Sequence, residues 1–325
     1  KGSKQGLDAV LLRWKKMEPI YAENVERNPG NYLNLTKLYI TQRKLGREKQ
    51  ALELLDRVLL LSMGSAKGLS LIGWEIHEAG YEDEAVKIWL QAATVAEPEG
   101  HDYDQAIAYL AHYGQSIYHK KQWKKAAAIS EVNAQLSMRG RSSGSINLIL
   151  RTRFYADFAQ GMHLLQKGQK SLAITKLNAC RKMIPGDGIL ADDFFPHIRK
   201  AGIGKLYDQW FEESYNHILA ACKLYPKSHN SRNTAAWLAS RSIRRLDEAL
   251  KHSEAALTQR PTQGAYLDTM AEVWFAKGNR DKAIEWSQKA VDGSIANAQG
   301  NPRSEKMVFS NYKQLNKQLE RFKND

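Results

Sequence analysis

The segment ILADDFFPHIRKAG, residues 189–202, brings together side chains that can hold a metal ion. Asp192, Asp193 and His197 offer two carboxylates and an imidazole, which are common ligands of divalent metals. Their D-D-x-x-x-H spacing matches no established metal motif. The same segment also fits a helix start, with Asp192 or Asp193 as the cap and Pro196 in the first turn. We favour the helix start, and the sequence therefore predicts no metal and no other cofactor.

A second segment, HDYDQAIAYLAHYGQSIYHKKQW at residues 101–123, is rich in His and Tyr. His112 and His119 lie seven residues apart and so share one face of a helix with Gln115. Imidazoles at that spacing could serve as a general base or as zinc ligands. No Cys or carboxylate completes such a set, and the pattern H-E-x-x-H is absent. We interpret this face as a polar and aromatic binding surface.

Other catalytic and cofactor-binding patterns are missing from the sequence. Ser, His and Asp are plentiful, but there is no G-x-S-x-G motif, phosphate-binding loop or dinucleotide-binding fingerprint. Cys180 and Cys222 fall in apolar helical patterns, and we predict that both are small core residues rather than a disulfide or a metal pair. The sequence thus predicts a protein that is not an enzyme.

The composition is that of a soluble protein, with 43% hydrophobic and 26% charged residues among 325. No run reaches the roughly 18 apolar residues of a membrane span. We expect a cytoplasmic location. Because the chain begins at Lys1, a removed signal peptide and an extracytoplasmic location stay open, as does the native status of residues 1–6. The net charge of +13 weakly favours an anionic partner, but the basic residues are spread along the chain, which is typical of a solvated exterior.

The elements that must position these side chains are visible as an internal repeat. LDEALKHSEAALTQRP carries Ala249 and Ala256, and RDKAIEWSQKAV carries Ala283 and Ala290, each 34 residues later. Small residues allow one helix to approach its neighbour closely, because ridges of side chains pack into the neighbour's grooves. The pattern recurs upstream as Gly46, Ala51 and Val58; Gly80, Ala85 and Ala92; and Gly168, Ala173 and Cys180. Two units depart from it, with Lys121 in place of the Gly and Ser214 in place of the first Ala.

This pattern resembles the tetratricopeptide repeat (TPR) family, in its multi-repeat, bacterial-type form, whose units are helix pairs that repeat every 34 residues. Seven units align, at about residues 32–65, 66–99, 107–140, 154–187, 195–228, 230–263 and 264–297. The family's small residue in the first helix appears as Gly73, Gly114, Gly161, Gly202 and Ala271. The resemblance implies an all-α fold, a right-handed α-solenoid of stacked helix-turn-helix hairpins over residues 31–298.

Both ends of the solenoid are predicted to carry capping helices. Residues 1–30 hold one from Leu7 to Arg27, and residues 299–325 hold one from Ser304 to Lys323. We expect a loop from Asp292 to Pro302 and longer spacers near residues 100–106, 141–153 and 187–195.

The resemblance also implies where a partner binds, because the family binds partners mainly on the concave surface lined by the first helices. Certain members clamp acidic carboxyl-terminal tails with Lys and Asn, and the matching positions here hold other residues: Thr36, Ile40, Leu71, Ala108 and His112. That activity is therefore not predicted. The same register places the following residues on the concave surface: Trp74, His77, His112, Gln115, Tyr118, His119, Tyr155, Phe158, Met162 and Arg199. We expect about half of them to be exposed.

Further polar residues are interpreted as structural. Asp187, in PGDG, is predicted to be a turn residue. Asn233 and Asp268 fall near the same phase of adjacent first helices, and we predict a hydrogen bond between them.

We interpret the chain as a non-enzymatic scaffold that binds a peptide or protein segment by several modest contacts on a preformed surface. A rival hypothesis is a nucleic-acid-binding solenoid, based on the net charge and on three clusters: Lys120-Lys121-Lys124-Lys125, Arg139 with Arg141, and Arg241-Arg244-Arg245. Two more hypotheses are a structural subunit of a larger assembly, and an enzyme that uses Asp192, Asp193 and His197 as a metal site. The oligomeric state is left open.

Overall fold

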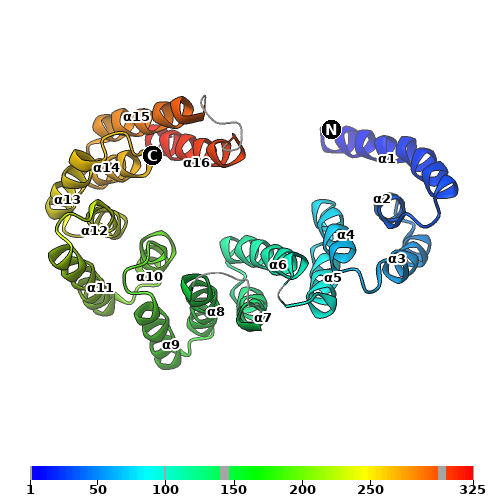
Figure 1. Ribbon diagram of the computed structural model, residues 1–325, viewed down its shortest axis with the longest axis horizontal. Coiled ribbons are helices and arrows are strands. Elements are labelled where there is room, and N and C mark those ends of the chain that lie inside the picture. The colour runs from blue at the N-terminus through cyan, green and yellow to red at the C-terminus, as the bar shows by residue number, and fades with distance from the viewer. Residues whose placement is uncertain (1, 99, 140–145, 299–304, 325) are drawn as a thin grey trace. The chain divides into compact units, whose positions relative to one another are not determined.

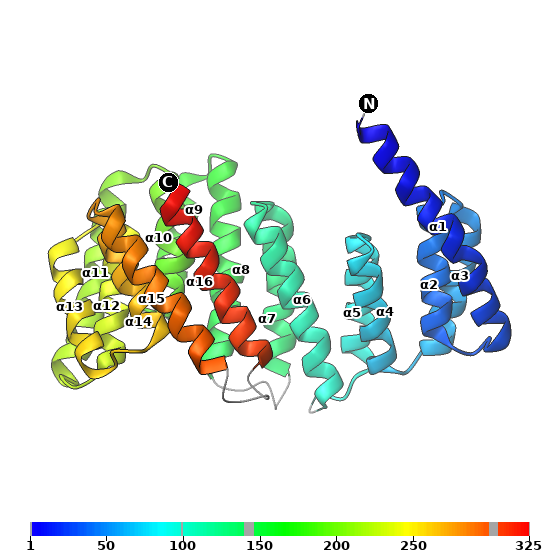
Figure 2. The same cartoon turned by 90° about the horizontal axis from the view of Figure 1, so that it is seen from above.

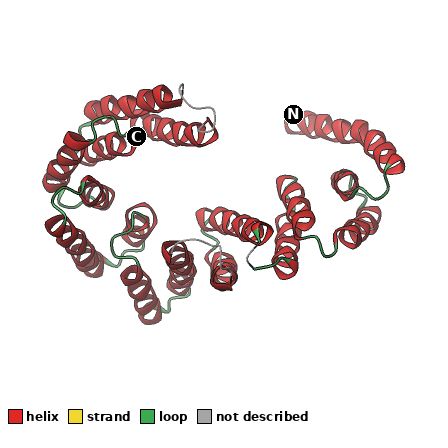
Figure 3. Ribbon diagram, in the orientation of Figure 1, coloured by secondary structure: helices red, strands yellow, loops and turns green. Residues whose placement is uncertain are grey.

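The computed structural model describes residues 2–98, 100–139, 146–298 and 305–324, and no β-strand occurs among them (Figures 1 and 3). The chain divides into two compact units, Lys1–Ala173 (unit 1) and Ile174–Asp325 (unit 2). Unit 1 holds α1 (Gly2–Arg27), α2 (Tyr32–Lys44), α3 (Glu48–Ser62), α4 (Ala66–Glu78), α5 (Glu82–Val95), α6 (His101–His119), α7 (Trp123–Arg139) and α8 (Ile146–Gln166). The boundary falls within α9 (Lys170–Met183). Unit 2 continues with the π-helical turn η1 (Leu190–Phe194), α10 (Phe195–Lys200), α11 (Gly204–Leu224), α12 (His229–Ser242), α13 (Leu246–Gln259), α14 (Gly264–Ala276), α15 (Arg280–Ala298) and α16 (Glu305–Asn324). Within the described ranges, no helix is both long and apolar enough to cross a membrane.

Consecutive helices pair as hairpins. In unit 1, α2 packs on α3, α4 on α5 and α6 on α7, and in unit 2 α12 packs on α13 and α14 on α15 (Figure 2). The first helices also contact one another along each unit, as α2 with α4, α4 with α6, and α12 with α14. These contacts confirm the predicted fold class, an all-α solenoid of stacked helix-turn-helix hairpins.

The repeated small residues lie where hairpins pack most tightly. The alanines of the second helices have no exposed surface: Ala51, Ala85, Ala126, Ala173, Ala249 and Ala283. Ser214, which replaces this alanine in α11, is also buried. Cys180 and Cys222 are buried core residues, as predicted. Close helix packing therefore explains both the residue type and the 34-residue period.

Gly73 in α4 shows how strict this requirement can be. The indole of Trp89 in α5 lies so close that a Cβ at position 73 would be 2.4 Å from Nε1 and 2.6 Å from Cδ1. Trp89 is completely buried, and its Nε1 donates a hydrogen bond to the carbonyl oxygen of Ser70 at 3.2 Å. A glycine at this position is therefore a packing requirement rather than a source of flexibility.

The turns inside the hairpins share one backbone conformation. A residue just after the first helix has a left-handed backbone. In five hairpins it is a glycine, and in the α6–α7 and α12–α13 turns it is Lys121 and Ile243; the glycines are Gly46, Gly80, Gly168, Gly202 and Gly278. In the α4–α5 turn, the amide of Gly80 donates to the carbonyl of His77, and the amide of Tyr81 donates to the carbonyl of Ile76. This arrangement satisfies the last carbonyl groups of the first helix.

The irregular segments differ from the predicted ones. Residues 101–106 are not a spacer, because α6 already begins at His101. The predicted spacer at 141–153 is helical from Ile146, where α8 begins. Residues 140–145 lie outside the described residues. The spacer at 187–195 contains η1, so the first helix of this hairpin is η1 followed by α10. Gly202, predicted to lie within a first helix, instead lies in the turn after α10 with φ +70°.

The predicted loop from Asp292 to Pro302 is wrong over its first part, because α15 continues to Ala298. Residues 299–302 lie outside the described residues. After this segment α16 packs on α15, and Leu319 and Phe322 of α16 are buried. Phe322 lies in one apolar cluster with Ala271 and Ala283. This cluster gives the described end of unit 2 an apolar core of its own.

Candidate partner-binding surface

Four aromatic side chains form a cluster on the first helices α4 and α6 of unit 1. Trp74 of α4 stacks on Tyr109 of α6, with ring centroids 5.1 Å apart. His112 of α6 lies 6.0 Å from Trp74 and 6.1 Å from His77, again between ring centroids. We call these residues, Trp74, His77, Tyr109 and His112, the aromatic cluster. The repeat register predicts three of them, Trp74, His77 and His112, as residues of the concave surface.

The aromatic cluster packs on a buried side chain on one side and is accessible to solvent on the other. Tyr109 also contacts the buried Trp89, with ring centroids 5.4 Å apart. Trp74, His77 and Tyr109 are half-buried, whereas His112 is exposed. Rings with few rotatable bonds that are already held in place lose little entropy when a partner packs on them. The cluster therefore has the properties of a binding anchor.

The exposed face of α6 extends the aromatic cluster toward the end of that helix. Gln115 and His119 are both exposed. They follow His112 by three and seven residues, so all three side chains lie on one face of α6. The predicted polar and aromatic surface on α6 is thus a continuous row of accessible side chains.

Three of the predicted surface residues are core residues instead. Tyr118, Phe158 and Met162 are buried. The ring centroids of Tyr118 and Phe158 lie 5.7 Å apart, so Tyr118 of α6 faces α8 rather than solvent. Tyr155 is half-buried, with its ring centroid 5.5 Å from that of Tyr118. An error of one residue turns a helical side chain by about 100°, which moves it from the surface into the core.

Arg199, the remaining predicted residue, lies on α10 in unit 2 and is exposed. It does not belong to the aromatic cluster, all of whose members lie in unit 1.

The rival hypothesis of a metal site at residues 192–197 can be compared with the contacts of these side chains. Among the described residues, no group of three or more His, Cys, Asp or Glu side chains is arranged to hold a metal ion. Asp192 Oδ1 accepts a hydrogen bond from Trp237 Nε1 at 2.8 Å. His197 Nδ1 lies 2.6 Å from the backbone carbonyl of Asp193, within its own helical segment.

The predicted helix start at residues 192–196 is confirmed in part. Pro196 lies in the first turn of α10, but neither Asp192 nor Asp193 caps a helix through its side chain. The side chain that orders this region is Asp187, whose Oδ1 accepts a hydrogen bond from the amide of Ile189 at 3.0 Å. The prediction of Asp187 as a turn residue is therefore confirmed.

The predicted hydrogen bond between Asn233 and Asp268 is not formed. Oδ1 of each residue is buried without a hydrogen-bond partner among the described residues. The arginines that could have balanced Asp268 pair with Glu272 one turn later, Arg241 at 3.2 Å and Arg321 at closer range. Burial raises the pKa of Asp268 to about 7, and the negative charge of Glu272 adds to this effect. Asp268 therefore lowers the stability of the folded protein when it is ionised, and its contacts show no structural role.

Sequence comparisons and fold comparisons give different results. No protein-family model and no curated protein matches the chain in sequence. In fold, the chain is similar to yeast Tom70, with 13% identity, a TM-score of 0.40, and coverage of 98% of this chain and 61% of Tom70. It is similar to YrrB, a TPR protein with an unusual peptide-binding site, with 14% identity, a TM-score of 0.21, and coverage of 84% and 91%. For the APC/C hetero-tetramer Cut9–Hcn1 the identity is 15%, the TM-score 0.34 and the coverage 95% and 54%.

The chain spans less than two thirds of the Tom70 and Cut9–Hcn1 chains that it matches. The repeat itself rests on this chain's own residues, through the 34-residue period, the buried alanines and the shared turn conformation. With its hairpins stacked on those residues, the chain is an α-solenoid whose repeat resembles that of the tetratricopeptide repeat family.

Proposed function

We propose that the chain is a non-enzymatic scaffold that binds a peptide or protein segment on the first-helix face of unit 1. The observation that carries this proposal is the aromatic cluster, in which half-buried Trp74 stacks on Tyr109 beside the exposed His112. Trp and Tyr are the residues most often found as energetic anchors in protein interfaces. Their rings offer apolar area, while the indole N–H, the phenol and the imidazole offer hydrogen bonds to a peptide backbone.

The arrangement of charge supports a protein partner over a nucleic acid. The arginine cluster at residues 241–245 is largely engaged within unit 2, because Arg244 pairs with Asp208 and Arg245 pairs with Glu212. In unit 1, Lys120 pairs with Glu82 at 2.9 Å. Basic side chains that bridge neighbouring hairpins contribute less to a uniform positive field for phosphates. Arg141, of the predicted cluster with Arg139, lies outside the described residues.

A test of this proposal replaces the accessible members of the aromatic cluster. A Trp74→Ala/His112→Ala variant is compared with a Tyr225→Ala variant, which removes an exposed aromatic ring outside the cluster. Proteins are captured from nuclease-treated native lysate on each immobilised chain. A segment of the captured protein is then titrated against each variant by calorimetry.

We expect the double variant to weaken binding by about 30-fold or more, the loss typical of an interface anchor. Tyr225→Ala is expected to bind as the parent chain does. Equal binding by all three proteins would overturn the first-helix face as the binding site. A partner that binds only through nucleic acid, with an affinity that falls steeply with salt, would favour the nucleic-acid hypothesis instead.

A further inference from the structure

A group of polar side chains on the first helices of unit 2 keeps bonding capacity that the fold does not use. Asp192 of η1 and Asp268 of α14 form no ion pair with any residue that the structure describes. Oδ1 of Asp268 and Oδ1 of Asn233 in α12 are buried, and neither accepts a hydrogen bond from the described residues. We call Asp192, Asn233, Trp237 and Asp268 the acceptor cluster. All four belong to unit 2.

Three elements that pack on one another hold the acceptor cluster. The central element is α12, which contacts both η1 and α14. Asn233 and Trp237 are four residues apart and therefore share one face of α12. Trp237 Nε1 donates to Asp192 Oδ1 at 2.8 Å, which joins this face to η1. The charge of Asp192 in turn acts on the carboxyl of Asp268. The four side chains thus belong to one surface that spans three elements.

The two arginines next to the acceptor cluster are engaged by another residue. Arg241 of α12 and Arg321 of α16 both pair with Glu272, which is buried. Gln318 donates a further hydrogen bond to the same carboxylate at 2.5 Å. The arginines therefore act on Asp268 only at longer range, and its charge is left unbalanced when it ionises. An anionic ligand would have to displace Glu272 from both arginines.

The unused atoms of the acceptor cluster indicate the class of ligand. Its buried atoms without a partner are both oxygens, which require a donor, and its two unpaired carboxylates require positive charge. Asn233 and Asp268 are half-buried and Asp192 is exposed, so a ligand can approach these side chains from solvent. A metal ion fits less well, because the described residues contain no group of three or more His, Cys, Asp or Glu arranged to hold one.

The form of the cation follows from the oxygens that are still available. Asp192 already uses Oδ1 for the indole of Trp237, and Oδ1 of Asp268 is buried. Each carboxylate therefore offers one oxygen, which suits the compact charge of an ammonium group better than the bidentate fork of a guanidinium. The half-buried indole of Trp237 provides an apolar surface for the aliphatic stem of a lysine.

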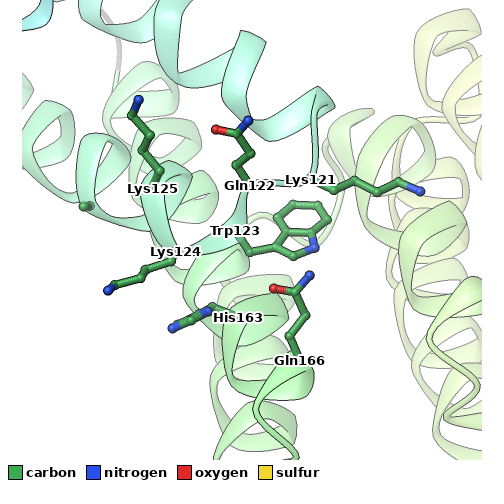
Figure 4. A pocket seen from close by; sticks show the side chains of 8 residues that line it. Lys121, Gln122, Trp123, Lys124, Lys125, His163 and Gln166 are labelled. Carbon is green, nitrogen blue, oxygen red and sulfur yellow. The ribbon is translucent and has the colours of Figure 1, made fainter. Parts of the chain in front are cut away.

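A cavity in unit 1 shows a different arrangement of charge. It has a volume of about 440 Å³ and lies beside Lys121 at the start of α7. The ammonium groups of Lys121 and Lys124 point to opposite sides of Trp123 (Figure 4), and only 3% of Trp123 is exposed. These groups do not define one position for a ligand. In the acceptor cluster, the bond from Trp237 to Asp192 and the packing of α12 on α14 keep the groups on one surface.

We propose that the acceptor cluster binds a lysine side chain of a protein segment, with the ammonium group against Asp268, the charge of Asp192 reinforcing it, and the stem on Trp237. This site shares no residue with the aromatic cluster and goes beyond the function proposed for unit 1.

The proposed site has a characteristic pH dependence. Neighbouring protein atoms limit the hydration of both carboxyls, which raises the pKa of Asp192 to about 6 and the pKa of Asp268 to about 7. The charged groups that act on them are Asp187, Asp193 and Glu272, which add to the rise, and Arg241 and Arg321, which oppose it. A cation requires ionised carboxylates, so affinity is expected to increase as the pH rises from 5 to 8.

The test uses a fluorescein-labelled peptide in which Lys alternates with Gly and Ser, titrated against the full chain by fluorescence anisotropy at pH 8. Two further peptides carry Gln or Arg in place of every Lys. The net charge of +13 opposes unspecific attraction of a basic peptide, so binding reports a local site. The variants are Asp268→Asn and Asp192→Asn. The matched control is Asp281→Asn, which removes the same charge from an exposed acid in the first turn of α15.

We expect each of the two variants to weaken binding of the Lys peptide about tenfold, as for the loss of one charge-assisted contact. Asp281→Asn is expected to bind it as the parent chain does, and the Gln peptide is expected not to bind. The affinity of the parent chain should rise with pH, and this rise should be smaller in Asp268→Asn. Because Asp268→Asn removes an unbalanced buried charge, it is expected to be more stable than the parent chain at pH 8. A loss of binding in that variant therefore cannot come from unfolding.

Four outcomes would overturn the proposal. The first is a parent chain that does not bind the Lys peptide or binds the Gln peptide equally well. The second is an affinity that is unchanged in both variants, or reduced to the same extent by Asp281→Asn, which would assign the effect to overall charge. The third is tighter binding of the Arg peptide, which would indicate a guanidinium site. The fourth is competition by Mg²⁺ at a concentration near that of the peptide, which would assign the carboxylates to a metal ion.

Discussion

Two consecutive hairpins of unit 1, α4–α5 and α6–α7, have the same fold but differ in how well their residues suit it. In α4–α5, Gly73 leaves room for the indole of Trp89, and Gly80 takes the left-handed turn position. The second helix then opens with the acidic run Glu82–Glu84, which suits the helix dipole. Every one of these choices favours the folded hairpin.

The α6–α7 hairpin departs from the same scheme at two of these places. Lys121 takes the left-handed position, and Lys124 and Lys125 replace the acidic first turn. These residues lower stability and line one pocket. These two neighbouring hairpins thus differ in how closely their residues follow the preferences of the fold, which alone would favour Gly and Asp or Glu at these places.

The comparison of the two hairpins predicts its largest change in stability for a substitution at Gly73. We expect Gly73→Ala to destabilise unit 1 by about 3 kcal/mol, because the new Cβ would overlap Trp89, which is buried and hydrogen-bonded. The measurement is the urea midpoint of the helical circular dichroism signal. The loss should appear with an unchanged spectrum at zero denaturant. A variant as stable as the parent chain would show that Trp89 can move aside, and the packing role of Gly73 would be wrong.

In unit 2, Asp268 is another residue that lowers the stability of the fold, as Lys121 and Lys124 do in unit 1. Burial raises its pKa to about 7, well above the ordinary value of 3.8, so the folded state holds this proton more tightly than the unfolded state does. Stability from this group is therefore highest below about pH 4 and is lost as the pH rises toward 7. Asp268→Asn should remove that loss and stabilise the chain by about 2 kcal/mol at pH 8, with little effect at pH 4.

The measurement is the urea midpoint of both proteins from pH 4 to pH 8. The matched control is Asp281→Asn, because Asp281 is an exposed acid in the first turn of α15. The gap between Asp268→Asn and the parent chain should widen steadily with pH. A constant gap would mean that the carboxyl of Asp268 titrates as an ordinary Asp, and Asp268 would no longer count as a costly residue.

The repeat architecture could be predicted because it depends on local and periodic features. A helix pair that stacks on copies of itself needs a small residue at a fixed place in each copy, and Ala85, Ala249 and Ala283 report that need directly. The irregular region around η1 could not be predicted, since its π-helical turn is set by burial of Phe194 and Phe195 rather than by a repeat signal.

The candidate sites were harder to predict for two physical reasons. Exposure depends on which neighbour covers a helix face, and Phe158 is covered by contacts with Tyr118 and Trp123 that a single repeat register does not contain. Tyr109 was missed because its position faces Trp74 of the previous hairpin, and that contact depends on the offset between hairpins. At the start of α7, the replacement of Gly by Lys121 was visible in the sequence, but the cavity beside it was not.

Gly114 sharpens the contrast with Gly73, since both are small residues at the equivalent place in a first helix. A Cβ at position 114 would lie 3.6 Å from Ile129 Cγ2, which is ordinary van der Waals contact. We expect Gly114→Ala to stabilise unit 1 by about 1 kcal/mol, because alanine is the better residue inside a helix. The same urea midpoint measures it. If Gly114→Ala were destabilising, the α6–α7 hairpin would be as tightly packed as α4–α5, and the two glycines would not differ.

Lys121→Gly has the smallest expected effect on stability among these substitutions. It tests the difference between the two hairpins most directly. The left-handed backbone costs an L-residue about 1–2 kcal/mol, and the greater freedom of glycine in the unfolded chain offsets about half of that. We therefore expect a net gain of about 0.5 kcal/mol, measured as a rise in Tm and in the urea midpoint. Gly80→Lys, the reverse change in the neighbouring turn, should lose stability, since φ there is +89°. If instead Lys121→Gly lowered stability, the lysine would be making contacts that the fold needs. The α6–α7 hairpin would then be suited to its fold in the same way as its neighbour, and the contrast between the two turns would disappear.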